Sequence, residues 1–92
     1  MTLRVEYEAQ VKKAAGVASE DLEIEDASTL SSVLQKITES RGDALHSMLL
    51  DSEGNLQKAI LLFHGDRQIR WDESPEFSDG DVLTILSPIS GG

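Results

Sequence analysis

The sequence of 92 residues has no cysteine, two prolines, four aromatic residues and only eight Lys and Arg residues. Without cysteine the chain forms no disulfide and no Cys-based zinc site, and no side chain can carry a persulfide. No segment approaches the roughly 20 consecutive apolar residues of a membrane span, and charged residues from Arg4 onward interrupt any signal-peptide core. We therefore expect a cytoplasmic protein that does not enter a membrane.

Positive charge is scarce relative to negative charge. Seventeen Asp and Glu residues outnumber the basic residues and give a formal net charge of −9 at pH 7. Such a surface repels phosphate backbones and anionic lipid headgroups, which argues against nucleic acid and membranes as partners. A basic protein surface suits it better, since opposite fields accelerate encounter.

The chain is also short of catalytic motifs. It contains no glycine-rich phosphate loop, no Gly-x-Ser-x-Gly elbow and no His-Glu-x-x-His pattern. His46 and His64 stand apart without a paired ligand pattern, so we expect ordinary structural roles for both and no metal site. A chain of this length forms one small domain, which presents a surface or a chain end more readily than a deep active-site cleft.

Hydrophobic periodicity predicts an α+β protein. Residues 3–12 alternate between apolar and polar, which is typical of a half-buried strand, and the chain turns helical near 12–15. Leu30, Val33, Leu34 and Ile37 follow helical spacing after Ser28 or Thr29, and Arg41-Gly42 ends that helix. Further elements are predicted as a strand over 22–25, a short helical turn over 44–49, a buried strand over 59–63, a short edge strand over 68–71 and a strand over 82–86 that is central or covered on both faces.

This order predicts a β-grasp, or ubiquitin-like, fold, with a mixed sheet of four to five strands and one main helix on one face. Residues 1–87 would form the domain and residues 88–92 a flexible C-terminal tail. We interpret the segment 77–81 as a structural turn in which Phe77 plugs the core, and not as a site built on Asp79 or Asp81. The strand carboxylates, including Glu6, Glu8, Glu23 and Glu25, should face water.

The tail ends in two glycines directly after a strand and a proline. Pro88 stiffens the exit of the chain, and Gly91 and Gly92, which have no Cβ atoms, would pass through a channel that excludes larger residues.

Residues 79–92, from Asp79-Gly80-Asp81 through the last strand to Pro88 and Gly91-Gly92, resemble the C-terminal signature of the MoaD/ThiS sulfur-carrier proteins. Residues 9–16 resemble the MoaD branch. The resemblance implies that a ubiquitin-activating-like adenylyltransferase uses ATP to adenylate the carboxylate of Gly92, which then becomes a thiocarboxylate. The thiocarboxylate would donate sulfur in cofactor or metabolite biosynthesis.

The same resemblance implies a carrier that is not an enzyme, binds no cofactor and supplies no catalytic side chain. Its tail residues Gly91, Ser90, Ile89 and Pro88 would thread into the activating enzyme and into a sulfur acceptor. That acceptor would be an enzyme such as the molybdopterin synthase large subunit or thiazole synthase.

Three alternatives to a general sulfur carrier stay open. One is a protein modifier conjugated to lysines through Gly92, the second is specifically the small subunit of molybdopterin synthase, and the third is an interaction domain with an inert tail. Ser87 stands where MoaD-like chains often have proline, and the outward residues of the first strand are polar, which disfavours a large hydrophobic subunit interface. Val82, Thr84 and Leu86 would form a smaller partner patch beside the tail.

Overall fold

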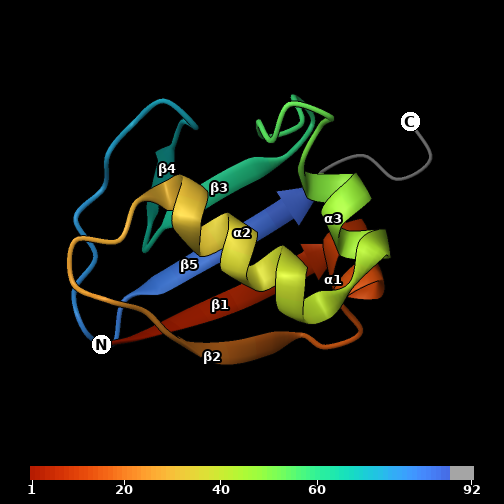
Figure 1. The fold of residues 1–92 in the computed structure, drawn as a ribbon. Coiled ribbons are helices and arrows are strands. Elements are labelled where there is room, and N and C mark those ends of the chain that lie inside the picture. Colours follow the sequence, from red (N-terminus) through yellow and green to blue (C-terminus); the bar gives the residue numbers. More distant parts are fainter. Residues whose placement is uncertain (88–92) are drawn as a thin grey trace.

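The computed structural model describes residues 1–87, which form a five-stranded mixed sheet with three helices on one face (Figure 1). The strand order is β2-β1-β5-β3-β4. The β-grasp fold predicted from the sequence is confirmed. Its elements are β1 Thr2–Ala9, α1 Gln10–Ala15, β2 Ser19–Glu23, α2 Leu30–Arg41, α3 Asp43–Leu49, β3 Leu61–His64, β4 Arg67–Ile69 and β5 Val82–Ser87.

The first strand ends earlier than its alternation predicts. At Ala9 the backbone takes φ 57° and ψ −131°, and α1 begins at Gln10 and ends at the left-handed Gly16. Ala9 marks a sharp change of direction, because a side chain disfavours positive φ. Alternation continues through this bend by chance, since Val11 is buried as a helical residue and not as a strand residue.

The last strand of the sequence, β5, is the central strand of the sheet. β1 pairs antiparallel with β2 and parallel with β5, while β5 pairs antiparallel with β3, so β5 lies at the centre as predicted. The second strand occupies Ser19–Glu23, earlier than the predicted 22–25, because its pairing with Thr2–Glu6 begins directly after the α1 turn. The short fourth strand is displaced similarly, to Arg67–Ile69.

The predicted main helix is confirmed as α2, which begins after Thr29. The Thr29 side chain accepts a hydrogen bond from the Ser32 amide at 3.1 Å, as an N-cap does. Two shorter helices join α2 on the same face, because the predicted turns near 12–15 and 44–49 are the helices α1 and α3. These helices cover a core that includes Tyr7, Leu34, Leu45, Leu62, Leu83 and Ile85.

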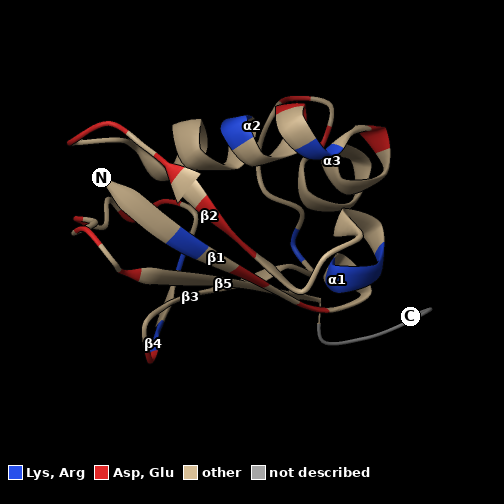
Figure 2. Ribbon diagram, turned by 90° about the horizontal axis from the view of Figure 1, so that it is seen from below, with Lys and Arg blue, Asp and Glu red and all other residues tan. Residues whose placement is uncertain are grey.

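The opposite face of the sheet bears no helix in the part of the chain that the structure describes (Figure 2). β5 is therefore not covered on both faces: Leu83 and Ile85 are buried against the helices, whereas Val82, Thr84 and Leu86 are only half-buried. Within residues 1–87 no helix is long and apolar enough to span a bilayer.

Candidate functional site

The predicted tail residues Pro88, Ile89, Ser90, Gly91 and Gly92 lie outside the described residues. The point from which they continue is Ser87, the buried last residue of β5. Ser87 pairs with Ala9 at the end of β1, beside α1. The central strand therefore delivers the chain to the end of the sheet where β1 turns into α1 (Figure 1).

A turn at the other end fixes the start of β5. The Asp81 carboxylate accepts a hydrogen bond from the Ser78 amide at 2.8 Å and lies 2.7 Å from His64 Nε2, while Asp79 accepts from the Thr2 amide at 2.7 Å. His64 and the Ser78 amide hold the pKa of Asp81 below its ordinary value. Phe77 packs against the core and meets the His64 ring edge-on, as expected for a structural turn over 77–81.

The two histidines stand apart from each other in the described part of the chain. His64 is held by Asp81, and His46 is an exposed residue of α3. Within residues 1–87 no group of three or more His, Asp or Glu side chains could hold a metal ion.

An apolar patch lies on the open face of the sheet and runs toward the end of β5. Its register pairs Leu86 with Leu61 and Thr84 with Phe63, and all four are half-buried. We call this the open-face patch; its members are Val82, Thr84, Leu86, Leu61 and Phe63. The sequence correctly placed the three β5 residues on one outward face.

The two β3 residues of the patch were missed. The continuous run 59–63 predicted a fully buried strand, but only Leu62 of β3 is buried, while Leu61 and Phe63 face outward. A run of apolar residues does not distinguish a covered strand from one with an apolar open face. Knowledge of the antiparallel pairing of β3 with β5 would have identified Leu61 and Phe63 as outward residues, because directly opposite residues on paired strands lie on the same face of the sheet.

Charged residues border the open-face patch on the β1 side. Arg4 and Glu6 form an ion pair at 3.1 Å, and Glu8 stands opposite Leu86. The prediction of a polar β1 surface is therefore confirmed, and the apolar surface is displaced to β5 and β3.

Positive charge stands at the end of the sheet where β5 finishes. Lys12 and Lys13 are exposed on α1 and, with Ala9 and Val17, line a shallow hollow of about 600 Å³. Figure 2 shows these basic positions on α1, acidic positions in the loops at the opposite end, and further acidic positions on the strands and beside α3.

One partly buried polar cluster joins β1, β2 and α2. Glu20 accepts two hydrogen bonds from Arg41, at 2.8 and 2.9 Å, and a third from the Tyr7 hydroxyl. Burial and then the Glu20 carboxylate raise the pKa of Tyr7, whereas the Arg41 guanidinium lowers that of Glu20. These three side chains hydrogen-bond to one another, and the cluster ties β1, β2 and α2 together.

Comparisons with known proteins agree with this arrangement. The family model described as the ThiS family matches residues 5–92. No curated protein sequence matches the chain significantly.

Similar solved structures span the whole described fold. SAMP1 of Haloferax volcanii, a small archaeal modifier protein, is 21% identical with a TM-score of 0.86, and each chain is covered completely. A putative molybdopterin converting factor subunit 1 of Pyrococcus furiosus is 22% identical with a TM-score of 0.73, over 97% of this chain and 99% of that one. The BexX/CysO complex of Amycolatopsis orientalis contains a chain that is 26% identical with a TM-score of 0.69, over 98% and 99%.

Proposed function

The chain belongs to the ThiS family, and on this basis we propose that it is a sulfur carrier whose terminal residue Gly92 bears sulfur as a thiocarboxylate. The observation that carries the proposal is the extent of the family match, which continues past the folded domain through residues 88–92 to Gly92. The absence of cysteine supports it, since no side chain offers an alternative place for the sulfur.

The chemistry needs two steps on the carboxylate of Gly92. One carboxylate oxygen attacks the α-phosphate of ATP, which gives an acyl adenylate and releases pyrophosphate. Hydrosulfide then attacks the acyl carbon, AMP leaves with that oxygen, and a thiocarboxylate is formed. An adenylate is displaced far more readily than a free carboxylate, whose leaving group would be oxide. Catalytic groups for both steps would belong to the activating enzyme.

The folded domain would act as a handle for that enzyme and for the sulfur acceptor. The open-face patch on β5 and β3 runs toward Ser87, so a protein bound there lies beside the point from which the tail continues. Gly91, Ser90, Ile89 and Pro88 would then thread toward the partner's active site. The solved BexX/CysO complex supports a protein partner for a chain of this fold.

The acceptor belongs to the class of enzymes that take sulfur from a protein thiocarboxylate, of which the molybdopterin synthase large subunit and thiazole synthase are two. The charge of −9 favours activating and acceptor enzymes with basic surfaces around their docking sites.

The proposal is tested by incubating the protein with ATP, hydrosulfide and the adenylyltransferase from the same organism, followed by intact-mass measurement. We expect a mass gain that corresponds to replacement of one oxygen by sulfur, located on Gly92 by fragmentation. A chain that lacks Gly91 and Gly92 is the control and should stay unmodified. An intact chain that stays unmodified while the enzyme adenylates another carrier would contradict the proposal.

The same experiment separates the carrier from a protein modifier. Conjugation would use the same adenylate, but it would leave Gly-Gly remnants on lysines after proteolysis of cell extracts. Such remnants without any thiocarboxylate would favour the modifier, of which SAMP1 is an example by name.

A further inference from the structure

A groove lies at the end of the domain where β5 begins. Ser87, from which the tail continues, is at the opposite end of β5. The groove has a volume of about 700 Å³ and is bounded by the loop between β2 and α2 and the loop between β4 and β5. The two loops lie on the side of Figure 1 that contains the N-terminus. β5 separates the groove from Ser87 by about 17 Å, at roughly 3.3 Å per residue.

The floor of the groove is apolar and aromatic. Met1, Leu30, Trp71 and Phe77 line it, so that two of the four aromatic residues of the chain meet at one surface. Trp71 is half-buried, and its indole nitrogen donates to Asn55 Oδ1 at 3.3 Å, which orients the ring. A half-exposed, oriented indole offers both contact area and a face that attracts cations.

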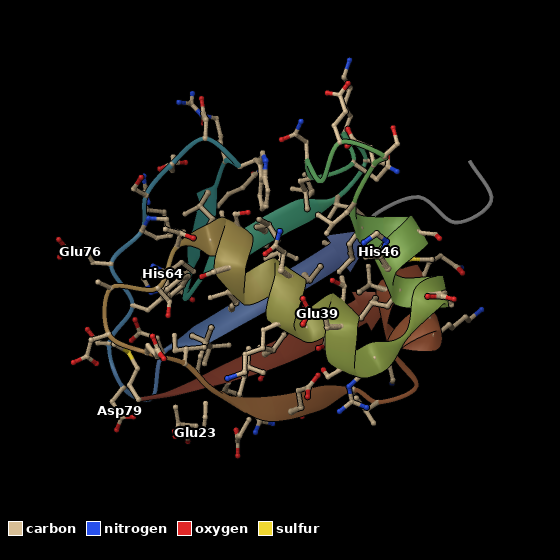
Figure 3. The ribbon with its side chains drawn as sticks, in the orientation of Figure 1. Glu23, Glu39, His46, His64, Glu76 and Asp79 are labelled. Carbon is tan, nitrogen blue, oxygen red and sulfur yellow. The ribbon has the colours of Figure 1, made fainter. Side chains whose placement is uncertain are left out.

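The rim of the groove is acidic. Asp26, Asp72, Glu73 and Glu76 line it, and no Lys or Arg does. Arg70 pairs with Asp72 at 3.0 Å and Arg67 with Glu73 at 2.5 Å, which leaves Asp26 and Glu76 outside every ion pair within residues 1–87. Figure 3 shows Glu76 projecting outward from the β4–β5 loop.

The opposing charges at the groove are weaker. The N-terminus of α2 contributes only about half a positive charge. The terminal ammonium of Met1 keeps its charge while it donates to the Ile24 carbonyl at 2.9 Å, so one ammonium faces the four carboxylates of the lining. The groove is therefore net negative around an apolar floor. This combination suits a ligand that carries an apolar side chain between cationic ones, and it repels acidic or phosphorylated ligands.

We propose that this acidic groove is a second docking site, which binds a short basic segment of a partner protein through one apolar side chain flanked by Lys or Arg. Charge complementarity selects the partner, and the Trp71–Phe77 floor holds its apolar residue. Because the groove and the end of β5 lie at opposite ends of the sheet, a protein bound in the groove leaves the tail accessible. The site is independent of the sulfur chemistry proposed above.

The single tryptophan makes the groove directly observable, since Trp71 fluorescence reports on it alone. Three synthetic peptides without aromatic residues serve as probes: Gly-Lys-Arg-Leu-Leu-Arg-Lys-Gly, its acidic counterpart with Glu and Asp, and a basic peptide with Ser in place of Leu. We expect saturable change of Trp71 emission with the first peptide and none with the acidic one. The serine peptide should bind roughly tenfold more weakly, because it buries little apolar surface.

Two variants that remove the same charge distinguish peptide binding in the groove from nonspecific attraction of a basic peptide to an acidic protein. The double variant D26N/E76Q should weaken binding of the basic leucine peptide roughly fivefold, as expected for two solvent-exposed charges. The control E39Q/E53Q removes the same charge from exposed positions outside the groove; Figure 3 shows Glu39 on α2. It should change the affinity less than about twofold, since distant exposed charges are screened.

Three outcomes would overturn the proposal. They are equal binding of the leucine and serine peptides, equal binding of the acidic peptide, and equal weakening by the two double variants. Deletion of Gly91 and Gly92 should leave peptide binding unchanged, whereas it abolishes thiocarboxylate formation, so failure of one proposal is distinguishable from failure of the other.

Discussion

Glu20 is the residue at which three elements of the fold meet. It lies on β2 and binds the Arg41 guanidinium of α2 with both oxygens, and it also accepts from the Tyr7 hydroxyl of β1. Its side chain is only 16% exposed, so these hydrogen bonds are partly shielded from water. Partly buried bonds to charged groups contribute more to stability than ion pairs in full contact with solvent.

Replacement Glu20→Gln should lower the free energy of unfolding by about 1–2 kcal/mol at neutral pH, because it removes the carboxylate that Arg41 and Tyr7 share. The folded-state pKa of Glu20 lies below its ordinary 4.5. Its stabilising contribution is therefore present above that value and lost as the pH falls through the folded-state pKa. Urea denaturation should show that the difference in free energy of unfolding between wild type and variant is smaller at about pH 3 than at neutral pH.

The control for this experiment is Glu25→Gln. Glu25 is exposed and its carboxylate takes part in no ion pair within residues 1–87, so the variant should stay within about 0.5 kcal/mol of wild type. Equal destabilisation by both variants would show that the loss reflects net charge and not the Tyr7–Glu20–Arg41 cluster.

Sequence patterns predicted residues with local roles and failed for residues with distant partners. Thr29 as an N-cap and Gly42 after α2 follow from the spacing of their own segment. Glu20 lies before the predicted strand over 22–25, and the sequence did not indicate its role, because its partners are Tyr7 on β1 and Arg41, which lies 21 positions away at the end of α2. The tail residues 88–92 were noted from the sequence for their two glycines after a proline, and the match to the ThiS family model extends through them to Gly92.

Among the elements, β3 has one face in the core and the other on the open side of the sheet. Leu62 faces the helices and is 1% exposed, while Phe63 faces outward in the open-face patch opposite Thr84. The two neighbouring residues are apolar for different reasons. Leu62 fills the core, whereas Phe63 belongs to the surface that we propose for a partner.

Truncation of each residue to alanine should separate these roles. Leu62→Ala should destabilise the protein by about 2–4 kcal/mol, because it opens a cavity in the core. Phe63→Ala should cost about 1 kcal/mol or less, yet weaken association with the activating enzyme about tenfold, as loss of an aromatic contact does. Urea denaturation and calorimetric titration measure the two effects. Comparable destabilisation by both variants would contradict the assignment of Phe63 to a docking surface.

The boundaries of an element could be predicted where the hydrophobic period of the sequence changes. The prediction was wrong where the period continues unchanged across a boundary. The change to helical spacing after Thr29 placed α2 correctly. No change of period marks Ala9, because Val11 satisfies both the strand alternation and the buried face of α1. The bend there depends on a positive φ at an alanine, for which a sequence pattern offers no warning.

For the whole molecule, the distribution of its charge matters as much as the net value of −9. Acidic positions gather in the loops near the start of β5, and basic positions occur on α1 near its end (Figure 2). Composition alone predicted an acidic protein, but the separation of the two ends depends on the order β2-β1-β5-β3-β4. The sequence predicted the β-grasp fold class, but it did not predict the order of the strands in the sheet.

Sodium chloride should stabilise the folded domain. An excess of like charge favours expansion of the chain, and salt screens that repulsion over a Debye length that falls from about 30 Å at 0.01 M to about 3 Å at 1 M. We expect the free energy of unfolding to rise by about 1 kcal/mol over this range, measured by urea denaturation. Since surface ion pairs weaken under the same conditions, a net decrease would show that the pairs outweigh the repulsion.

The parallel pairing of β1 with β5 also governs when the protein can fold. The first strand finds its central neighbour only after every other described element has been made, and such long-range pairing is slow. A growing chain that ends before β5 holds the β1–β2 hairpin, and a lone hairpin is marginally stable. The domain, the open-face patch and the delivery of Ser87 to the sheet's end therefore arise in one step. An interrupted translation product that ends before β5 would lack Val82, Thr84 and Leu86, and with them most of the surface that we propose for the partner enzyme.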